Sequence, residues 1–298
     1  MKILYTGANG LLGQKISVAT SQYSNHAFLA TARGANRTKY LGTAAYASMD
    51  ITDRKEIKNV LSEFHADVII HGAAMTNVDE CEKHKELAYR LNVVGTQNIV
   101  DAAREINAHL IFISTDFVFD GQDGPYDENG LPNPISYYGE TKLQAERIVQ
   151  TVENWSIIRT ALVIGIAEDL SRSNIILWAK EALEKAQPIR IVSDQFRTPT
   201  LVEDLAQGAL LMATQRALGI FNISGPDFMS IYQLVEAVAK YFGLSMANVD
   251  KVNSSMLNQP AMRPPRTGFD ISKAIENLGY RPHSLEEALE IIAQQAGL

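Results

Sequence analysis

The chain has 298 residues, of which 46% are apolar and 20% are charged, an ordinary composition for a globular protein. This length predicts one large or two ordinary domains, with roughly 75% of the unfolded surface buried on folding. The net charge of −7 and the lack of a long Lys/Arg block argue against nucleic-acid or anionic-membrane binding. The single Cys81 excludes an internal disulfide, and no apolar run suits a signal peptide or a membrane span. We therefore expect a cytoplasmic protein without nucleic-acid or membrane partners.

The first residues predict a strand, a glycine loop and a helix. Lys2 to Thr6 is a short apolar run, and the glycine-rich stretch 7–13 follows it directly. The glycines of such a loop permit a tight turn, the approach of a pyrophosphate to the backbone, and close packing of the helix on the sheet. The free N–H groups at the start of the helix favour a phosphate. We expect a dinucleotide site whose loop residues are Gly7, Asn9, Gly10, Leu11, Leu12 and Gly13.

The second predicted strand, Ala27 to Ala32, indicates which dinucleotide binds. An NAD-binding enzyme usually carries an acidic residue after this strand, which holds the ribose 2′-hydroxyl. This chain has Arg33 at that point, and Arg37 and Lys39 follow. A cationic loop suits the 2′-phosphate of NADP, so we predict NADP(H) as the cofactor. An ordinary solvated loop is the alternative interpretation of the same residues.

Further cofactor contacts are expected along the carboxyl edge of the sheet. Residues 67–71 predict a strand buried on both faces, and the small residues 72–74 after it leave room for a ligand. A helix is expected from about Asp79 to Ile106. On it, Asn92 is either an unimportant face residue or a backbone clamp beside the site, and Cys81 is interpreted as structural. The predicted contacts are Asp50 and Ile51, which would lie beside the adenine, with Ala73, Ala74, Thr76 and Asn92.

Catalytic chemistry is indicated by a helix predicted from Ser136 to Val152. Tyr138 and Lys142 stand four residues apart on it and so project from one face. The phenol pKa of roughly 10 is lowered by a nearby ammonium group, which allows proton exchange near neutral pH. Gly139 between them suggests that a neighbour approaches the helix backbone closely. The preceding buried strand delivers Thr115, whose hydroxyl can hydrogen-bond a substrate carbonyl. Alone, the Tyr–Lys spacing is a weak signal, because two common surface residues often fall at this distance.

Beyond residue 159 the alternation of strands and helices loosens. We expect helices near Asn174–Lys185, Glu203–Thr214, Ile231–Phe242 and Leu285–Gln295, strands at Ile189–Val192 and Ile220–Ile223, and a Pro-rich loop from Asn253 to Thr267. The predicted fold class is α/β: a Rossmann-type doubly wound parallel sheet with a smaller C-terminal α/β substrate-binding lid. Residues 1–159 would form the NADP-binding domain, with a returning segment near 197–223. Residues 160–196 and 224–298 would form the lid.

Taken together, several stretches resemble the extended short-chain dehydrogenase/reductase family. They are the glycine loop, Asn92, Ser114 to Gly121, and Tyr138 to Lys142. The branch that this chain resembles most is that of the dTDP-4-dehydrorhamnose reductases, on the strings Ser114 to Phe119, Asp194 to Thr200 and Arg263-Pro264. Two positions depart from that branch, because Leu162 stands where Trp is usual and Arg197 replaces a small residue.

The resemblance implies a Rossmann domain, a nicotinamide cofactor, and the reduction by NADPH of a nucleotide-linked 4-keto-6-deoxy sugar. It also implies that Thr115, Tyr138 and Lys142 form the catalytic group, in which Tyr138 donates the proton and Lys142 holds the nicotinamide ribose. The substrate is expected to contact Thr115, Asn174, Arg197 and Arg263. No metal is required, because the hydride comes from the cofactor.

Two other functions stay open at this point. The first is a regulatory or scaffolding subunit that retains bound NADP(H) without turnover. The second is a nucleotide-sugar epimerase or dehydratase with the same Thr-Tyr-Lys group, although such enzymes favour the acidic residue that is missing after the second strand. The sequence names neither the nucleotide nor the sugar, and it leaves a homodimer open.

Overall fold

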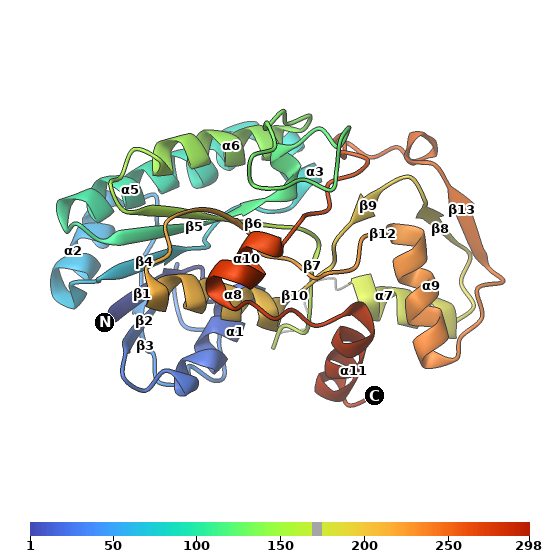
Figure 1. Cartoon of the computed structure of the whole chain (residues 1–298), viewed down its shortest axis with the longest axis horizontal. Coiled ribbons are helices and arrows are strands. Elements are labelled where there is room, and N and C mark those ends of the chain that lie inside the picture. The colour runs from blue at the N-terminus through green and yellow to red at the C-terminus, as the bar shows by residue number, and fades with distance from the viewer. Residues whose placement is uncertain (169–174) are drawn as a thin grey trace.

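The computed structural model describes residues 1–168 and 175–298. At its centre is a seven-stranded parallel sheet with the order β11-β6-β5-β4-β1-β2-β3 (Figure 1). The strands are β1 (Lys2–Thr6), β2 (Ala27–Ala32), β3 (Ala45–Ser48), β4 (Val68–His71), β5 (His109–Thr115), β6 (Trp155–Thr160) and β11 (Gly219–Asn222). The strand order reverses between β1 and β4, which is where open parallel sheets bind their ligands. The predicted doubly wound Rossmann-type sheet is confirmed.

Apolar runs explain why the central strands lie inside the sheet. Leu4 of β1 lies between Leu29 of β2 and Ile69 of β4 in the parallel register. All four residues of β4 are buried, as expected for a strand that is covered on both faces. The strands therefore form a rigid platform whose carboxyl ends carry the loops of the site.

Helices cover both faces of the sheet (Figure 1). One face is packed by α1 (Leu11–Ala19), α8 (Val202–Gln215) and α10 (Ser272–Leu278), whose buried side chains share one core cluster with β1 and β2. The other face is packed by α2 (Arg54–Phe64), α5 (Gly95–Glu105) and α6 (Tyr137–Val149). The second half of the chain contributes α8, α10 and β11. It therefore supplies one edge strand of the central sheet and two of the helices that cover one of its faces.

A separate apolar cluster lies in the second half of the chain. It is formed mainly by α7 (Ile175–Glu184), α9 (Ile231–Phe242) and α11 (Leu285–Ala296), next to the parallel pair β8 (Ile189–Val192) and β13 (Val249–Val252). Two further short pairs join β7 (Val163–Ile164) to β10 (Thr200–Leu201) and β9 (Phe196–Arg197) to β12 (Met229–Ser230). The predicted bounds of α9 and β8 are confirmed, whereas α10 and β13 were not predicted. The division of the chain into domains stays a prediction.

The long helix expected from Asp79 to Ile106 is wrong in one respect, because the structure breaks it. It consists of α3 (Val78–Lys83), α4 (Lys85–Tyr89), the π-helical segment η2 (Arg90–Val94) and α5. His84 between the first two helices has φ −124° and ψ 58°, which is not helical. A π-helical turn in a longer helix often marks a functional site, and η2 carries Asn92. Among the described residues, no helix is long and apolar enough to cross a membrane.

Candidate active site

The glycine loop between β1 and α1 is packed too tightly for side chains. Gly7 has φ +80°, and a Cβ on Gly13 would lie 2.4 Å from the Gly7 carbonyl oxygen. Gly10 precedes α1 as its N-cap in an extended conformation, and the first turn of α1 contains no acidic residue. A Cβ on Gly7 would also lie 3.0 Å from the Ala73 nitrogen. The loop therefore lies against the end of β4 and presents backbone N–H groups, which is the arrangement that binds a pyrophosphate.

Asn9 connects this loop to the segment after β2. Its side-chain amide donates to the Ala35 carbonyl oxygen at 3.0 Å and accepts from the Arg37 backbone N–H at 2.8 Å. At the far end of this segment, the Lys39 backbone N–H donates to a carboxylate oxygen of Glu168. Asn9 thus holds the cationic loop next to the glycine loop. The Arg33 side chain in that loop is exposed.

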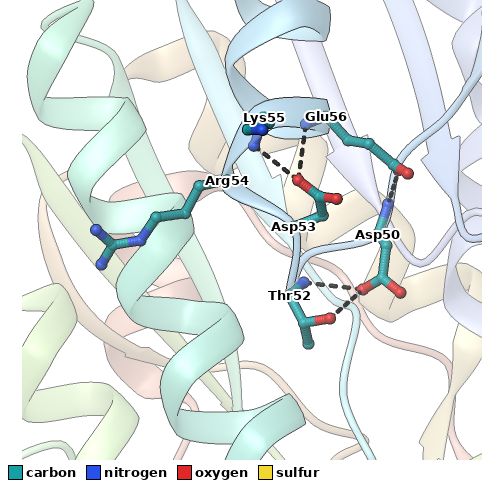
Figure 2. Close-up of a pocket in the computed structure, with 6 residues that line it drawn as sticks. All are labelled: Asp50, Thr52, Asp53, Arg54, Lys55 and Glu56. Atoms are coloured by element: carbon teal, nitrogen blue, oxygen red, sulfur yellow. Dashed lines mark hydrogen bonds between the residues drawn. The ribbon is translucent and has the colours of Figure 1, made fainter.

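The turn after β3 forms a surface depression of about 510 Å³ (Figure 2). The Asp50 carboxylate accepts from both the backbone and the hydroxyl of Thr52, at 2.8 Å each. Burial raises the pKa of Asp50, but the Thr52 hydrogen bonds and the charges of Arg33 and Arg90 outweigh this effect, so the pKa is lowered. The adjacent Ile51 is buried, and none of the predicted catalytic residues lines the depression.

A buried polar network ties the end of β1 to β4. The Thr6 hydroxyl accepts from the backbone N–H groups of Gly72 and Ala73, at 3.2 and 3.0 Å, and also contacts His71 Nδ1 at 2.8 Å. His71 Nε2 in turn contacts the Thr96 hydroxyl at 3.1 Å. Burial lowers the pKa of His71 to about 3, so the imidazole is neutral. Its interpretation as a packed strand residue agrees with this placement. Ala74 and the exposed Thr76 follow in the same loop.

Asn92 is a backbone clamp, the second of the two predicted alternatives. Its amide accepts from the Met75 N–H at 2.8 Å and donates to the Met75 carbonyl at 3.1 Å. It also donates to the Thr141 hydroxyl at 3.0 Å, and that hydroxyl donates to the Tyr138 carbonyl at 2.8 Å. The loop after β4 and the first turns of α6 are therefore held by one side chain of η2.

Tyr138 lies on α6 with its ring almost fully buried, at 7% exposure. The ring packs edge-on against Phe117, with 5.8 Å between the ring centroids. Gly139 does admit a close neighbour, as predicted, because a Cβ there would lie 2.1 Å from the Phe117 carbonyl oxygen. Burial raises the pKa of Tyr138, and the nearby Thr115 side chain opposes this effect. Because Phe117 follows Thr115 by two residues, its packing against Tyr138 places the phenol ring near the end of β5 that carries Thr115, as predicted.

Lys142 lies on the same face of α6 but does not act on the phenol as predicted. Its ammonium group donates to the Ile113 carbonyl at 2.6 Å and lies 3.9 Å from the Phe112 ring centroid. Burial lowers the pKa of Lys142 to about 7, although the Glu146 carboxylate opposes this shift. The expected lowering of the phenol pKa by Lys142 is corrected here, because burial of Tyr138 dominates and raises it.

Arg159 of β6 and Glu146 of α6 form a buried ion pair that was not predicted. Arg159 of β6 donates to both carboxylate oxygens of Glu146, at 3.1 and 2.8 Å, and Ser114 donates to Glu146 at 2.6 Å. Glu146 follows Lys142 by one helical turn, so an acid on this face of the helix was a signal available in the sequence.

Arg197 of β9 is buried, with 4% of its surface exposed. Its Nε lies 3.1 Å from an Asp116 carboxylate oxygen, and its terminal nitrogens donate to backbone carbonyls of Phe196, Pro264 and Pro265. The guanidinium is therefore directed at protein groups, which does not support the predicted direct contact with substrate. The role of Asp116 was not predicted, although the residue follows Thr115 directly in the sequence.

The other predicted substrate residues lie in the second half of the chain. Arg263 forms a two-pronged ion pair with Asp79 at the start of α3, with N–O distances of 3.1 and 2.7 Å. A diphosphate at Arg263 would therefore compete with Asp79. Asn174 lies outside the described residues. Within residues 1–168 and 175–298, no group of three or more His, Cys, Asp or Glu residues could hold a metal ion.

Comparison with known proteins identifies the family. A family model described as the RmlD substrate binding domain matches residues 1–297. The chain belongs to this family. Two solved structures are similar to this chain over almost its whole length. A dTDP-4-dehydrorhamnose reductase from Clostridium acetobutylicum is 28% identical with a TM-score of 0.86 and full coverage of both chains. The enzyme of that name from Bacillus anthracis, in complex with NADP, is 28% identical with a TM-score of 0.82 and 99% coverage of both chains. The predicted resemblance is confirmed.

Curated relatives in this family carry different names. Methionine adenosyltransferase 2 subunit beta from Danio rerio is 31% identical over 290 residues, which are 95% of this chain and 86% of the relative. The spore coat polysaccharide biosynthesis protein SpsK from Bacillus subtilis is 29% identical over 298 residues, 99% of this chain and 97% of the relative. Relatives similar in sequence to this chain thus carry both biosynthetic and subunit names.

Proposed function

We propose that the chain is an NADPH-dependent reductase of a nucleotide-linked 4-keto-6-deoxy sugar, similar to dTDP-4-dehydrorhamnose reductase. The observation that carries this proposal is the packing of Tyr138 against Phe117, two residues beyond Thr115 at the carboxyl end of β5, with Lys142 one turn further along α6. A hydroxyl, a phenol and an ammonium group in this arrangement suit proton transfer to a substrate oxygen. The dTDP-4-dehydrorhamnose reductases at 28% identity support the same substrate class.

The residues of the β1–α1 loop fit a nicotinamide dinucleotide. Gly7 and Gly13 stand where a Cβ would collide with backbone, and the start of α1 carries no acidic side chain to repel a phosphate. The exposed Arg33 is available for the 2′-phosphate of NADP, and Asn9 holds the loop that carries it. When bound, NADPH supplies a hydride to the ketone carbon of the substrate.

Side chains of the protein stabilise the developing negative charge and supply the proton in this reaction. Negative charge grows on the carbonyl oxygen as the carbon is reduced, and Tyr138 donates its phenolic proton to that oxygen. The raised pKa keeps Tyr138 protonated at neutral pH, which suits a proton donor in the reductive direction. Thr115 lies at the end of β5 near the phenol, and Lys142, whose ammonium group donates to the Ile113 carbonyl on the same strand, would hold the cofactor ribose. The nearly complete burial of Tyr138 and Lys142 keeps water away from this step.

The substrate nucleotide is assigned to the second half of the chain. Arg263 lies in the Pro-rich segment beside Asp79, and Asn174 is kept as a further predicted contact. Binding of a diphosphate at Arg263 requires that its ion pair with Asp79 be shared or broken. This pair is partly exposed, so the exchange costs little compared with a buried pair.

The test is NADPH oxidation by the purified protein on a panel of nucleotide-linked 4-keto sugars. The expected result is turnover on at least one dTDP- or UDP-linked 4-keto-6-deoxy sugar, and its loss in Tyr138→Phe. A parent protein that binds NADPH but reduces no member of the panel contradicts the proposal.

One alternative has a specific observation in its favour. Several relatives at 31–32% identity are named methionine adenosyltransferase 2 subunit beta, which suits a non-catalytic NADP-binding regulatory subunit. An epimerase or dehydratase is less well supported, because no acid follows β2. A cytoplasmic location and a homodimer stay predictions.

A further inference from the structure

The Thr115 hydroxyl has a hydrogen-bonding arrangement that the proposed reaction does not explain. It donates to an Asp116 carboxylate oxygen at 3.0 Å and accepts from the Phe117 backbone N–H at 3.2 Å. A threonine has only one hydroxyl proton. While that proton points to Asp116, it is not available to a substrate oxygen. Whatever fixes the ionisation and position of Asp116 therefore decides how Thr115 acts.

Within the described residues, three donors hold the Asp116 carboxylate. Thr115 donates to one oxygen, and the other oxygen receives the Thr267 hydroxyl at 2.5 Å and the Arg197 Nε at 3.1 Å. Both oxygens of the ionised form are thus occupied, in a place where an unpaired carboxylate would be protonated. Burial raises the pKa of Asp116, and the charge of Arg197 is the largest effect that opposes this rise, so Arg197 favours the ionised form.

The position of the Arg197 guanidinium is itself determined by backbone. Its terminal nitrogens donate to the carbonyls of Phe196 at 2.7 Å and Pro264 at 2.8 Å, which belong to two different segments of the second half of the chain. The planar guanidinium of arginine, with its fixed donor directions, can satisfy this set of acceptors. The ammonium group of a lysine, which acts as a point charge, cannot. Arg197 therefore connects the placement of these two segments to the end of β5.

A second contact leads from Arg197 to the phenol. Its guanidinium lies 5.5 Å from the centroid of the Phe117 ring, and that ring packs edge-on against Tyr138. Arg197 is thus connected to Thr115 through the carboxylate of Asp116, and to Tyr138 through the ring of Phe117.

We propose that Arg197 is a positioning residue, which directs the Thr115 hydroxyl through Asp116 and holds the Tyr138 ring through Phe117. The kinetic consequence rests on the proposed reductase activity, whereas the structural consequence does not. With Arg197 in place, the Thr115 proton points to Asp116. Without it, the buried carboxyl group takes up a proton, becomes a donor, and reverses the hydrogen bond to Thr115.

The first experiment needs no substrate. The protein is labelled with ¹³C at the threonine methyl groups, and the Thr115 resonance is assigned by its loss in Thr115→Ser. Arg197→Met is expected to shift this resonance, and Arg197→Lys to shift it less, because lysine restores the charge without the fork. Asp204→Asn is the matched control, since it neutralises another buried carboxylate, which lies on α8 and is paired with His283. An unchanged Thr115 resonance in the Arg197 variants overturns the proposal.

Arg197→Met leaves Asp116 unpaired and could prevent folding. Arg197→Met combined with Asp116→Asn removes both charges and keeps the test valid in that case. If Arg197 acts on Thr115 through Asp116, the loss of kcat in the double variant is smaller than the product of the two single losses, even though the contact with Phe117 is also lost. Fully multiplicative losses would show that the two residues act independently, which contradicts the proposal.

The steady-state kinetics separate positioning from direct binding. Loss of position is expected to lower kcat by about tenfold or more, with KM changed by less than about threefold. A rise in KM of about tenfold at unchanged kcat would show that Arg197 binds the substrate directly, and this overturns the proposal. If the parent reduces no substrate, the proposed reductase function fails, and the Thr115 resonance alone decides the positioning role.

Discussion

The Lys142 ammonium group donates a hydrogen bond to the carbonyl oxygen of Ile113, two residues before Thr115 on the same strand. A helix side chain is thereby attached to the strand that carries the proposed catalytic hydroxyl. Because the ammonium group also lies on the Phe112 ring and away from water, burial lowers the pKa of Lys142 to about 7. This pKa makes the stability of the protein depend on pH in a defined direction.

Between about pH 7 and pH 10, the folded protein is expected to become more stable relative to Lys142→Met. In this range the unfolded chain keeps the proton on Lys142, because the ordinary pKa of a lysine side chain is 10.5, whereas the folded protein has lost it. Stability rises with pH wherever the unfolded state binds more protons. The measurement is urea unfolding of both proteins, without cofactor, at several pH values from about 6 to about 10. A constant difference in unfolding free energy across this range would contradict the shifted pKa.

Tyr138→Phe is expected to lower turnover by about 10²–10⁴-fold, because general acid catalysis contributes by that factor. The substitution keeps the ring that packs on Phe117, so stability and NADPH affinity should change little. The assay is NADPH oxidation on a nucleotide-linked 4-keto sugar that the parent reduces. The matched control is Tyr137→Phe, which removes a neighbouring hydroxyl from α6 and should leave turnover within about twofold. Equal turnover of the two variants would remove Tyr138 from the mechanism.

Arg33→Ala is expected to weaken NADPH binding by about 10- to 100-fold and to leave NADH binding unchanged. The reason is that a charge-assisted hydrogen bond contributes roughly 1.5–3 kcal/mol, and only NADPH has the 2′-phosphate. Titration calorimetry with both cofactors measures the difference. Lys58→Ala removes an exposed cation on α2 and serves as the control for net charge. A loss of affinity for both cofactors, or for neither, would show that Arg33 does not select between them.

Breaking the pair of Glu146 with Arg159 is expected to cost about 3–5 kcal/mol of stability, because it leaves one buried charge without a partner. Both side chains are buried, and Arg159 donates to both carboxylate oxygens. Glu146→Gln and Arg159→Met should each show this loss in urea unfolding. The combination of Glu146→Leu with Arg159→Met removes both charges and should recover most of it. A double variant that is as unstable as both single losses combined would show that packing, and not charge, dominates this site.

The fold could be predicted where local patterns carry the information. The glycine loop between a short apolar strand and a helix identified the Rossmann unit, and α9 was bounded correctly by its apolar periodicity. The helix from Asp79 to Ile106 was wrong because its irregular segment is held by the contact of Asn92 with Met75 and Thr141. Thr141 lies 49 residues away in the chain, so no local pattern predicts that contact.

The candidate site was predicted less completely than the fold. The spacing of Tyr138 and Lys142 correctly placed them on one helix face, but the direction of the ammonium group depends on the Ile113 carbonyl of a neighbouring strand. Burial then sets the phenol pKa in the direction opposite to the one predicted. Arg197 stands out in the sequence as a departure from the family, yet its partner Asp116 lies in a different part of the fold. Side-chain direction and burial are tertiary properties, and spacing alone does not contain them.

The position of β11 in the chain has a consequence for biosynthesis. This strand and the preceding α8 complete the sheet and cover one of its faces, but they are translated only after β7, α7 and β8. When Thr160 has just left the ribosome, the nascent chain would expose the edge of β6 and the apolar face of the sheet that α8 later covers. An unpaired strand edge beside bare apolar surface promotes association with other chains. Premature termination near residue 160 should therefore yield an aggregating product, and the full Rossmann sheet can close only when residue 222 has left the ribosome.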